Sequence, residues 1–195
     1  MREYKIHIFG ASGSGTSTLG QSLALALNCR WIDTDSVYWR PTNPPYTDAR
    51  PRPERLALLK QQLNEQHNYI LSGSLCRWAD SIKGELTLAI FLQVPTLIRL
   101  QRLRERESAQ FGDRIKPNGD MAQIYSDFLI WAAQYDTADE SMRSLRQHQA
   151  WIKTLTCPIL ELDQTQTSAS LEKLTQVVRS YMNVLALKAN LQAME

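Results

Sequence analysis

One glycine-rich segment has the residue types and spacing of a phosphate-binding loop. It reads Gly10-Ala11-Ser12-Gly13-Ser14-Gly15-Thr16-Ser17-Thr18 and fits G-x-x-x-x-G-K-[ST] at every fixed position except the lysine. Glycines allow a ring of backbone N–H groups around one anion, and the N-terminus of a following helix adds donors. Ser17 has the position whose hydroxyl binds Mg²⁺. We therefore expect a loop that binds ATP and Mg²⁺; a glycine-serine turn without function is the alternative.

Thr16 stands where this motif has its lysine. That lysine normally brings a positive charge to the β- and γ-phosphates and follows them into the transition state. Threonine can donate a hydrogen bond but carries no charge. The sequence therefore predicts either an arginine that takes over this role or weak catalysis.

Two aspartates, Asp33 and Asp35, follow a short apolar segment. On an extended backbone this spacing puts both side chains on one face. One carboxylate would hold Mg²⁺, and the other would position or deprotonate an acceptor hydroxyl. A pair of loop aspartates that cap a local turn is the alternative.

Candidate acceptor-binding residues follow the second and third expected strands. Tyr38 and Trp39 could stack against a planar acceptor such as a base, or could pack the next loop against the body of the protein. Gly73 would let a ligand approach closely, and Arg77 could bind an acceptor phosphate. The third strand ends in Ser72-Gly73-Ser74 without an aspartate, so we expect no Walker B carboxylate there.

Several arginines follow the fourth expected strand. Arg99, Arg102 and Arg106 share one face of a predicted helix. This face either points toward the phosphates or, because Glu105 and Glu107 alternate with the arginines, is a solvated surface.

Three further arginines lie beyond this helix. Arg114 falls in a polar loop that a mobile lid could bring over the site. Arg143 and Arg146 form a candidate pair on a later predicted helix. We expect at least one of these arginines, or of the preceding group, to supply the charge that Thr16 lacks.

The elements that would position these residues alternate along the chain. Apolar segments predict strands at residues 5–9, 31–33, 69–71, 86–94 and 158–162. Helical spacing of apolar residues predicts helices that begin near residues 16, 53, 95, 121, 140 and 171, the fifth extending to 155, and five prolines indicate a loop at 41–53. This order predicts an α/β fold with a five-stranded parallel sheet, helices on both faces and ligands beyond the carboxyl ends of the strands.

Composition limits the class of protein. The 195 residues suffice for one domain, and a net charge of +2 gives no reason to expect nucleic-acid binding. Cys29, Cys76 and Cys157 form no CxxC pair, which argues against a disulfide framework or a zinc site. Neither a signal peptide nor a membrane span is indicated. We expect a cytoplasmic protein with a small-molecule acceptor and no membrane partner; the oligomeric state is not indicated.

Over nearly its whole length the chain resembles the adenylate-kinase-like group of P-loop kinases, which includes nucleoside monophosphate, shikimate and gluconate kinases. The resemblance rests on the glycine-rich loop, the Asp33-x-Asp35 pair, residues 91–95, the run 102–106, and Asp139 followed by Arg143 and Arg146. It implies a three-layer P-loop NTPase fold with strand order 2-3-1-4-5, one domain over 1–195, an acceptor-binding segment at 36–66 and a helical lid at 107–140. It also implies that Arg102 and Arg106 contact ATP and that Arg143 and Arg146 hold the transferring phosphates. By similarity to shikimate kinase, Asp33 would serve the metal and Asp35 the acceptor hydroxyl.

Three functional hypotheses follow. The first is an ATP-dependent phosphotransferase whose small acceptor is a nucleoside monophosphate. The second is a shikimate- or gluconate-like kinase, since the Asp33-x-Asp35 spacing is similar to that of shikimate kinase and Ser72-Gly73-Ser74 departs from the monophosphate kinase pattern Asp-Gly-[Phe/Tyr]-Pro-Arg. The third, motivated by Thr16, is a nucleotide-binding module without efficient catalysis.

Overall fold

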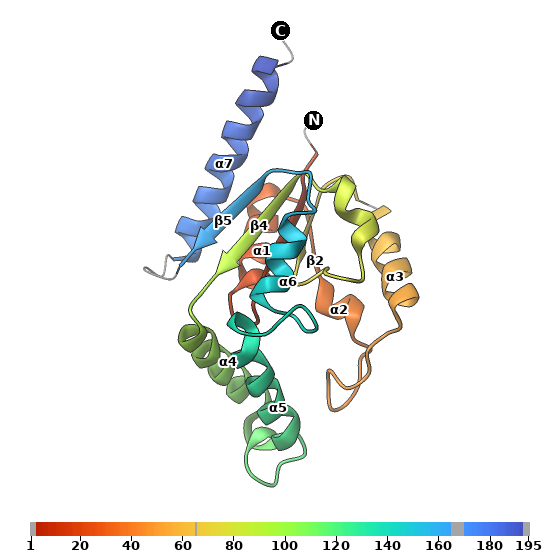
Figure 1. Cartoon of the computed structure of the whole chain (residues 1–195), viewed down its shortest axis with the longest axis vertical. Coiled ribbons are helices and arrows are strands. Elements are labelled where there is room, and N and C mark those ends of the chain that lie inside the picture. Colours follow the sequence, from red (N-terminus) through yellow and green to blue (C-terminus); the bar gives the residue numbers. More distant parts are fainter. Residues whose placement is uncertain (1–2, 65, 165–169, 193–195) are drawn as a thin grey trace.

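The computed structural model describes residues 3–64, 66–164 and 170–192 (Figure 1). The outermost residues of the predicted domain 1–195, and residue 65 of the predicted acceptor segment, lie outside this part. The strands are β1 (Lys5–Gly10), β2 (Arg30–Asp33), β3 (Tyr69–Ser72), β4 (Leu88–Gln93) and β5 (Ile159–Asp163). The α-helices are α1 (Thr16–Leu27), α2 (Thr34–Tyr38), α3 (Arg52–Asn64), α4 (Thr96–Phe111), α5 (Ala122–Ala133), α6 (Leu145–Ile152) and α7 (Leu171–Gln192). Short 3-10 helices are η1 (Asp80–Glu85), η2 (Gly112–Ile115) and η3 (Gln134–Asp136).

The five strands form one parallel sheet in the order β2-β3-β1-β4-β5. The central strand β1 pairs on both sides, so that Ile8 lies opposite Ser72 of β3 and Ile90 of β4. This arrangement confirms the predicted α/β fold and its strand order. In such sheets the carboxyl ends of neighbouring strands meet at one edge.

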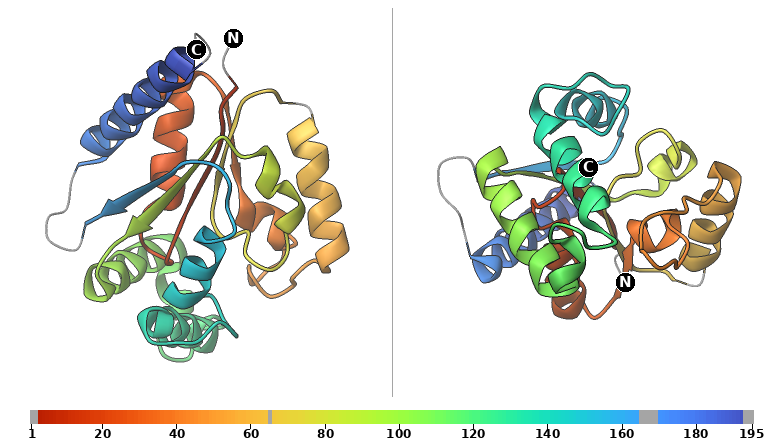
Figure 2. Two further views of the ribbon diagram at one scale, coloured as in Figure 1. Left: turned by 45° about the horizontal axis from the view of Figure 1, so that its top comes forward. Right: turned by 90° about the horizontal axis from the view of Figure 1, so that it is seen from below.

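Alternate residues of the strands pack into two separate cores. Ile6 and Ile8 of β1 pack in a cluster with residues of α1 and α7, whereas Phe9 packs with residues of α3, η1 and α6 on the opposite face. Figure 2 shows these helices on the two sides of the sheet. Burial of each such side chain stabilises the fold by roughly 1.5–3 kcal/mol. The three layers therefore follow from the period-2 pattern of strands that are apolar on both faces.

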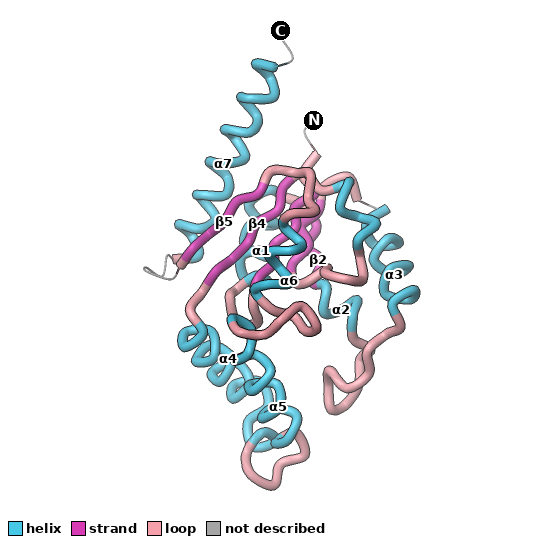
Figure 3. The backbone as a smooth tube through the Cα atoms, in the orientation of Figure 1, coloured by secondary structure: helices cyan, strands magenta, loops and turns pink. Residues whose placement is uncertain are grey.

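Long connections gather beyond the carboxyl ends of the strands. These are the loop from α2 to α3, the helical segment α4–η2–α5 and the turn before α6 (Figure 3). The loop predicted at 41–53 is present, although α3 begins at Arg52. A helical segment also occupies most of 107–140, and its action as a lid stays a prediction.

Two element predictions were wrong in extent. The apolar run 86–94 is a strand only over Leu88–Gln93. The helix predicted over 140–155 begins at Leu145, because Ser144 is its N-cap and accepts a hydrogen bond from the N–H of Gln147 at 3.1 Å. Ser144 also donates to the carbonyl of Asp139, which stabilises a turn in place of helix.

Neither a disulfide nor a membrane span is found in the described part. All three cysteines are free. Across residues 3–64, 66–164 and 170–192, no helix is both long and apolar enough to cross a membrane.

Candidate functional site

A cleft of about 790 Å³ lies beyond the carboxyl ends of the strands. This volume is typical of a site for a small molecule. Its lining comes from the glycine-rich loop, the start of α2 with the loop after it, the end of β3, the helical segment α4–α5 and the turn before α6. Segments far apart in the sequence thus surround one space (Figure 1).

The glycine-rich loop connects β1 to α1 through backbone positions that need glycine. Gly13 and Gly15 have φ values of 80° and 93°, and Gly15 is the N-cap of α1. A Cβ atom on Gly13 would lie 2.6 Å from the carbonyl oxygen of Arg99, and one on Gly10 would lie 2.5 Å from that of Leu92. The loop is therefore packed directly against α4 and β4, with a helix N-terminus behind it.

Part of the predicted phosphate loop lines the cleft. Ser14 is buried beneath this lining, and its hydroxyl has no hydrogen-bond partner within the described chain. Gly15 and Thr18 lie outside the lining. The residues that do line the cleft are Gly10, Ala11, Ser12, Gly13, Thr16 and Ser17.

The two aspartates line the cleft, but they do not extend from one strand face. Asp33 ends β2 and becomes the N-cap of α2, and its Oδ1 accepts a hydrogen bond from the N–H of Asp35 at 3.0 Å. The prediction of an extended segment was therefore wrong, because a capping aspartate starts a helix at this point. The alternative of aspartates that cap a local turn describes the backbone correctly, while both side chains still lie at the ligand-binding edge.

Several neighbouring groups act on the pKa of the Asp33 carboxyl. Burial raises its pKa, and the nearby charge of Asp35 raises it further. Hydrogen bonds from the N–H of Asp35 and from the Ser17 side chain, together with the charge of Arg106, oppose this increase. Ser17 of the glycine-rich loop is thus one of the groups that act on the Asp33 carboxyl.

Ser17 and Asp33 fit a magnesium ion bound together with phosphates. Mg²⁺ prefers oxygen ligands and is usually held by one or two carboxylates, water and substrate phosphates. Ser17 and Asp33 both line the cleft, and the side chain of Ser17 is one of the groups that lower the pKa of Asp33. No group of three or more acidic, histidine or cysteine side chains is found in residues 3–64, 66–164 and 170–192. An ion here would therefore need oxygen atoms from a ligand or from water.

The arginines of α4 have different surroundings. Arg106 lines the cleft, and its Nε and Nη2 atoms donate to Oε1 of Glu107 at 2.9 and 2.6 Å. Glu107, which the sequence did not single out, is buried and also lines the cleft. Arg102 is outside the lining, so its predicted contact with ATP stays a prediction.

Arg99 does not belong to a phosphate-facing surface, although it shares a helix face with Arg106. Its side chain is fully buried, and it donates to the carbonyls of Val94 at 2.9 Å and Ala132 at 3.3 Å. It also binds the carboxylate of Asp136 at 2.9 Å. The functional interpretation of this arginine was therefore wrong: it joins the start of α4 to the end of α5.

The predicted pair Arg143 and Arg146 is not on one helix. Arg143 precedes the N-cap of α6 and lines the cleft, with Nη2 4.0 Å from Oδ1 of Asp35 and the guanidinium 5.5 Å from the ring centre of Trp131. Arg146 lies on the exposed side of α6, outside the lining. The two diverge because Ser144 starts the helix between them.

The two remaining predicted arginines, Arg77 and Arg114, differ in their position relative to the cleft. Arg77 lines the cleft in a left-handed conformation, with φ of 68°, and donates to the carbonyls of Glu140 and Ser141 at 3.1 and 3.0 Å. Arg114 lies outside the lining.

Aromatic side chains form part of the lining of the cleft. Tyr38 and Trp39 both line the cleft, with ring centres 4.9 Å apart, and the guanidinium of Arg55 lies 3.5 Å from the centre of the Tyr38 ring. Gly73 also lines the cleft, and a Cβ there would lie 2.1 Å from Oγ1 of Thr34. Sequence reasoning did not assign several aromatic lining residues to the site, because the spacing of apolar residues does not tell a cleft-facing surface from a buried one. These residues are Tyr46, Trp78, Tyr125, Phe128 and Trp131.

Comparisons with known proteins agree with this fold and its phosphate loop. A family model described as AAA domain matches residues 6–124. The uncharacterized protein YqaC of Bacillus subtilis (strain 168) is 41% identical over 158 residues, which cover 81% of this chain and 87% of that protein.

Solved structures of kinases have the same architecture. A gluconokinase from Sinorhizobium meliloti 1021 superposes with a TM-score of 0.55 at 18% identity, covering 98% of this chain and 99% of the other. A shikimate kinase from Bacteroides thetaiotaomicron gives 0.57 at 18% identity, covering 93% and 99%. At this identity the likeness is one of fold. Because the family model spans more than half of the chain and the Bacillus relative is similar over most of it, this protein belongs to the AAA domain family and has the fold of P-loop kinases.

Proposed function

We propose that this protein transfers the γ-phosphate of ATP to a small acceptor, with a nucleoside monophosphate as the favoured one. One observation carries the proposal: the phosphate loop, the Asp33–Ser17 pair and the Asp35–Arg143 pair border the same cleft. A site for phosphoryl transfer needs such an arrangement, because catalysis depends mainly on positioning and charge stabilisation.

In this proposal the loop N–H groups and the hydroxyls of Thr16 and Ser17 bind the phosphates of ATP. Ser17 and Asp33 would hold Mg²⁺, which when bound neutralises negative charge on the phosphates. Arg106 supplies the positive charge that Thr16 lacks, because Glu107 uses only part of its five N–H donors. This assignment commits to one of the arginines that the sequence left open.

The acceptor half of the cleft is both aromatic and basic. Tyr38, Trp39 and Trp78 offer flat apolar surfaces, while Arg77 and Arg143 offer guanidinium groups that match phosphate oxygens. Together they suit a ligand with a planar ring and an anionic group. A nucleoside monophosphate has both features.

A hydroxylated metabolite is the second candidate, and the position of Asp35 favours it. Asp35 lines the cleft beside Asp33 and is only weakly engaged by Arg143, at 4.0 Å. Its carboxylate is thus available to accept the proton of an acceptor hydroxyl. A phosphate acceptor, whose attacking oxygen is already ionised, would need Arg143 more than Asp35. Loss of transfer in Asp35→Ala with intact ATP binding would therefore favour the metabolite.

Turnover with a panel of acceptors tests the proposal. Purified protein would be incubated with Mg²⁺-ATP and, in turn, nucleoside monophosphates, shikimate, gluconate and related sugar acids, while ADP formation is followed. We expect acceptor-dependent ADP formation by the wild type and its loss in Asp33→Ala. Binding of ATP with no stimulation by any acceptor would contradict the proposal and favour a nucleotide-binding module without efficient catalysis.

A further inference from the structure

Tyr46 lies in the loop between α2 and α3 in an unusual backbone conformation. Its φ is 63°, in the left-handed region that glycine and asparagine adopt more readily than tyrosine. The side chain is 49% exposed and lines the cleft. A bulky side chain kept in this conformation at a ligand site points to a role for the ring itself.

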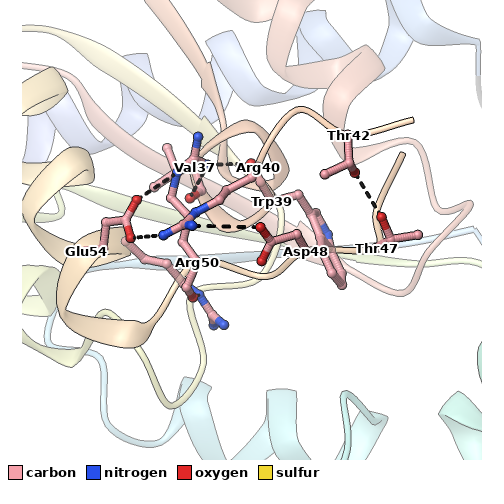
Figure 4. Close-up of polar contacts among 9 residues, drawn as sticks. Val37, Trp39, Arg40, Thr42, Thr47, Asp48, Arg50 and Glu54 are labelled. Carbon is pink, nitrogen blue, oxygen red and sulfur yellow. Dashed lines mark hydrogen bonds and ion pairs between the residues drawn. The ribbon is translucent and has the colours of Figure 1, made fainter. Parts of the chain in front are cut away.

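The loop that carries Tyr46 is well braced. Trp39 and Ala49 form an antiparallel bridge, and the N–H of Arg50 donates to the carbonyl of Tyr38 at 2.9 Å. The Arg50 guanidinium donates to the carbonyls of Val37 and Trp39, as Figure 4 shows.

Charged pairs and hydroxyls brace the rest of the loop. Arg40 binds Glu54 of α3 at 2.5 Å, and the hydroxyl of Thr47 donates to that of Thr42 at 3.0 Å (Figure 4). At the outer edge, Arg114 donates to the side-chain oxygen of Asn43 at 2.8 Å. These contacts hold the loop in place before a ligand arrives, which lowers the entropic cost of binding.

The ring of Tyr46 lines the cleft beside Trp39. Its ring lies nearly perpendicular to that of Trp39, at 78°, with the ring centres 6.1 Å apart. Burial raises the pKa of its hydroxyl, on which the charges of Asp35 and Arg106 also act. Tyr46 therefore lines the same cleft as Trp39, Asp35 and Arg106.

We propose that Tyr46 is a specificity-determining residue whose ring stacks on the planar ring of the acceptor. This inference rests on the proposed function and names the residue that would distinguish acceptors with a planar ring from acceptors without one. Because the two rings are nearly perpendicular, Trp39 does not stack on the phenol ring, and the half-exposed Tyr46 keeps ring surface for a base. Ligands without an aromatic ring gain nothing from this surface, because stacking needs a π face.

Binding of matched ligands to two variants tests the inference. Tyr46→Asn removes the ring while keeping a residue that adopts positive φ readily, and Tyr46→Phe keeps the ring. Each protein would be titrated by calorimetry with the four common nucleoside monophosphates and with ribose 5-phosphate, which has the sugar and phosphate but no base. ATP binding is the internal standard. Thr47→Ala, which loosens the same loop without touching a ring, is the control variant.

We expect Tyr46→Asn to weaken binding of the tightest monophosphate by about 5- to 150-fold, the range for loss of one base stack. Ribose 5-phosphate and ATP should change by less than about twofold, and Tyr46→Phe should bind like the wild type. Equal weakening of both acceptor ligands, no weakening, weakening in Tyr46→Phe, or a wild type that binds no monophosphate would each overturn the inference. Because binding needs no turnover, absence of ADP formation would contradict the proposed function while leaving this result intact.

Discussion

Acid should destabilise this protein through two histidines in its core. His7 of β1 and His148 of α6 are fully buried, and both contact the ring of Phe9, with ring centres 4.8 and 5.3 Å from it. Burial lowers the pKa of His7 from 6.5 to about 4, although a hydrogen bond to the carbonyl of Gly73 opposes this shift. Burial and the charge of Arg143 lower the pKa of His148 to about 3. Both rings are therefore neutral in the folded protein.

The direction of the pH effect follows from these lowered values. Well above pH 6.5 these rings hold no proton in either state, so the two histidines do not lower the free energy of unfolding. As the pH falls from 6.5 toward 4, the unfolded chain takes up protons that the folded chain refuses, and the free energy of unfolding decreases. Each histidine costs about 2 kcal/mol between pH 7 and pH 5, so the pair costs about 4 kcal/mol. Near pH 5.5 unfolding should take up almost two protons at these sites.

Urea unfolding from pH 7 to pH 5 measures this slope. His148→Gln keeps a side chain that can bond to the hydroxyl of Tyr135, which now lies 2.7 Å from Nδ1, and it removes one titrating group. We expect the decrease in unfolding free energy over this range to become about 2 kcal/mol smaller in this variant. His67→Gln is the matched control, because His67 is the exposed histidine among the three. An unchanged slope in His148→Gln, or an equal change in the control, would refute the reasoning.

Two further predictions concern contacts around the cleft. Arg99→Met should lower the free energy of unfolding by about 2–4 kcal/mol, because buried carbonyls and an ion pair with the half-exposed Asp136 lose their partner; urea unfolding with Arg104→Met as an exposed control checks this. Gly73→Ala should cost at least about 1–3 kcal/mol, since φ is 108° and the new Cβ would meet Thr34. Adding Thr34→Ala should recover part of that loss in thermal unfolding, and a strictly additive double variant would contradict the assigned clash.

The sequence predicted best where a pattern is local and repeated. Five apolar segments became five strands. The inner strands are buried on both faces, as Leu88–Gln93 shows, whereas the edge strands β2 and β5 are partly exposed. The glycine-rich loop was also predictable, since positive φ at Gly13 and Gly15 and close packing at Gly10 need the residues that the motif specifies. The strand order came from the resemblance to a family, because helical spacing does not determine which strands pair.

Prediction was weaker where one side chain decides between two structures. Asp33 ends a strand and starts a helix by capping it, and Ser144 does the same in front of α6, so the adjacent residues turn away from the expected direction. Arg99 and Arg106 share a helix face, yet one is buried by α5 and the other borders the cleft. Such differences depend on tertiary neighbours, which helical spacing alone does not identify. Tyr46 was not predicted as a site residue for the same reason, since its positive φ and its contact with Trp39 arise only in the folded structure.

The charge balance of the cleft indicates which groups would neutralise phosphate charge at a loop that has no lysine. In the proposed function ATP and an anionic acceptor would each bring negative charge, while the lining itself is close to neutral: it holds five guanidinium groups and four carboxylates, a formal charge of 5 − 4 = +1. Backbone donors and a divalent cation must therefore carry much of the neutralisation, and Thr16 makes both more important. The proposed function therefore predicts that Asp33→Ala lowers the rate of phosphate transfer more in this protein than in a relative that has the lysine. The charged lining residues are Arg52, Arg55, Arg77, Arg106, Arg143, Asp33, Asp35, Glu107 and Asp127.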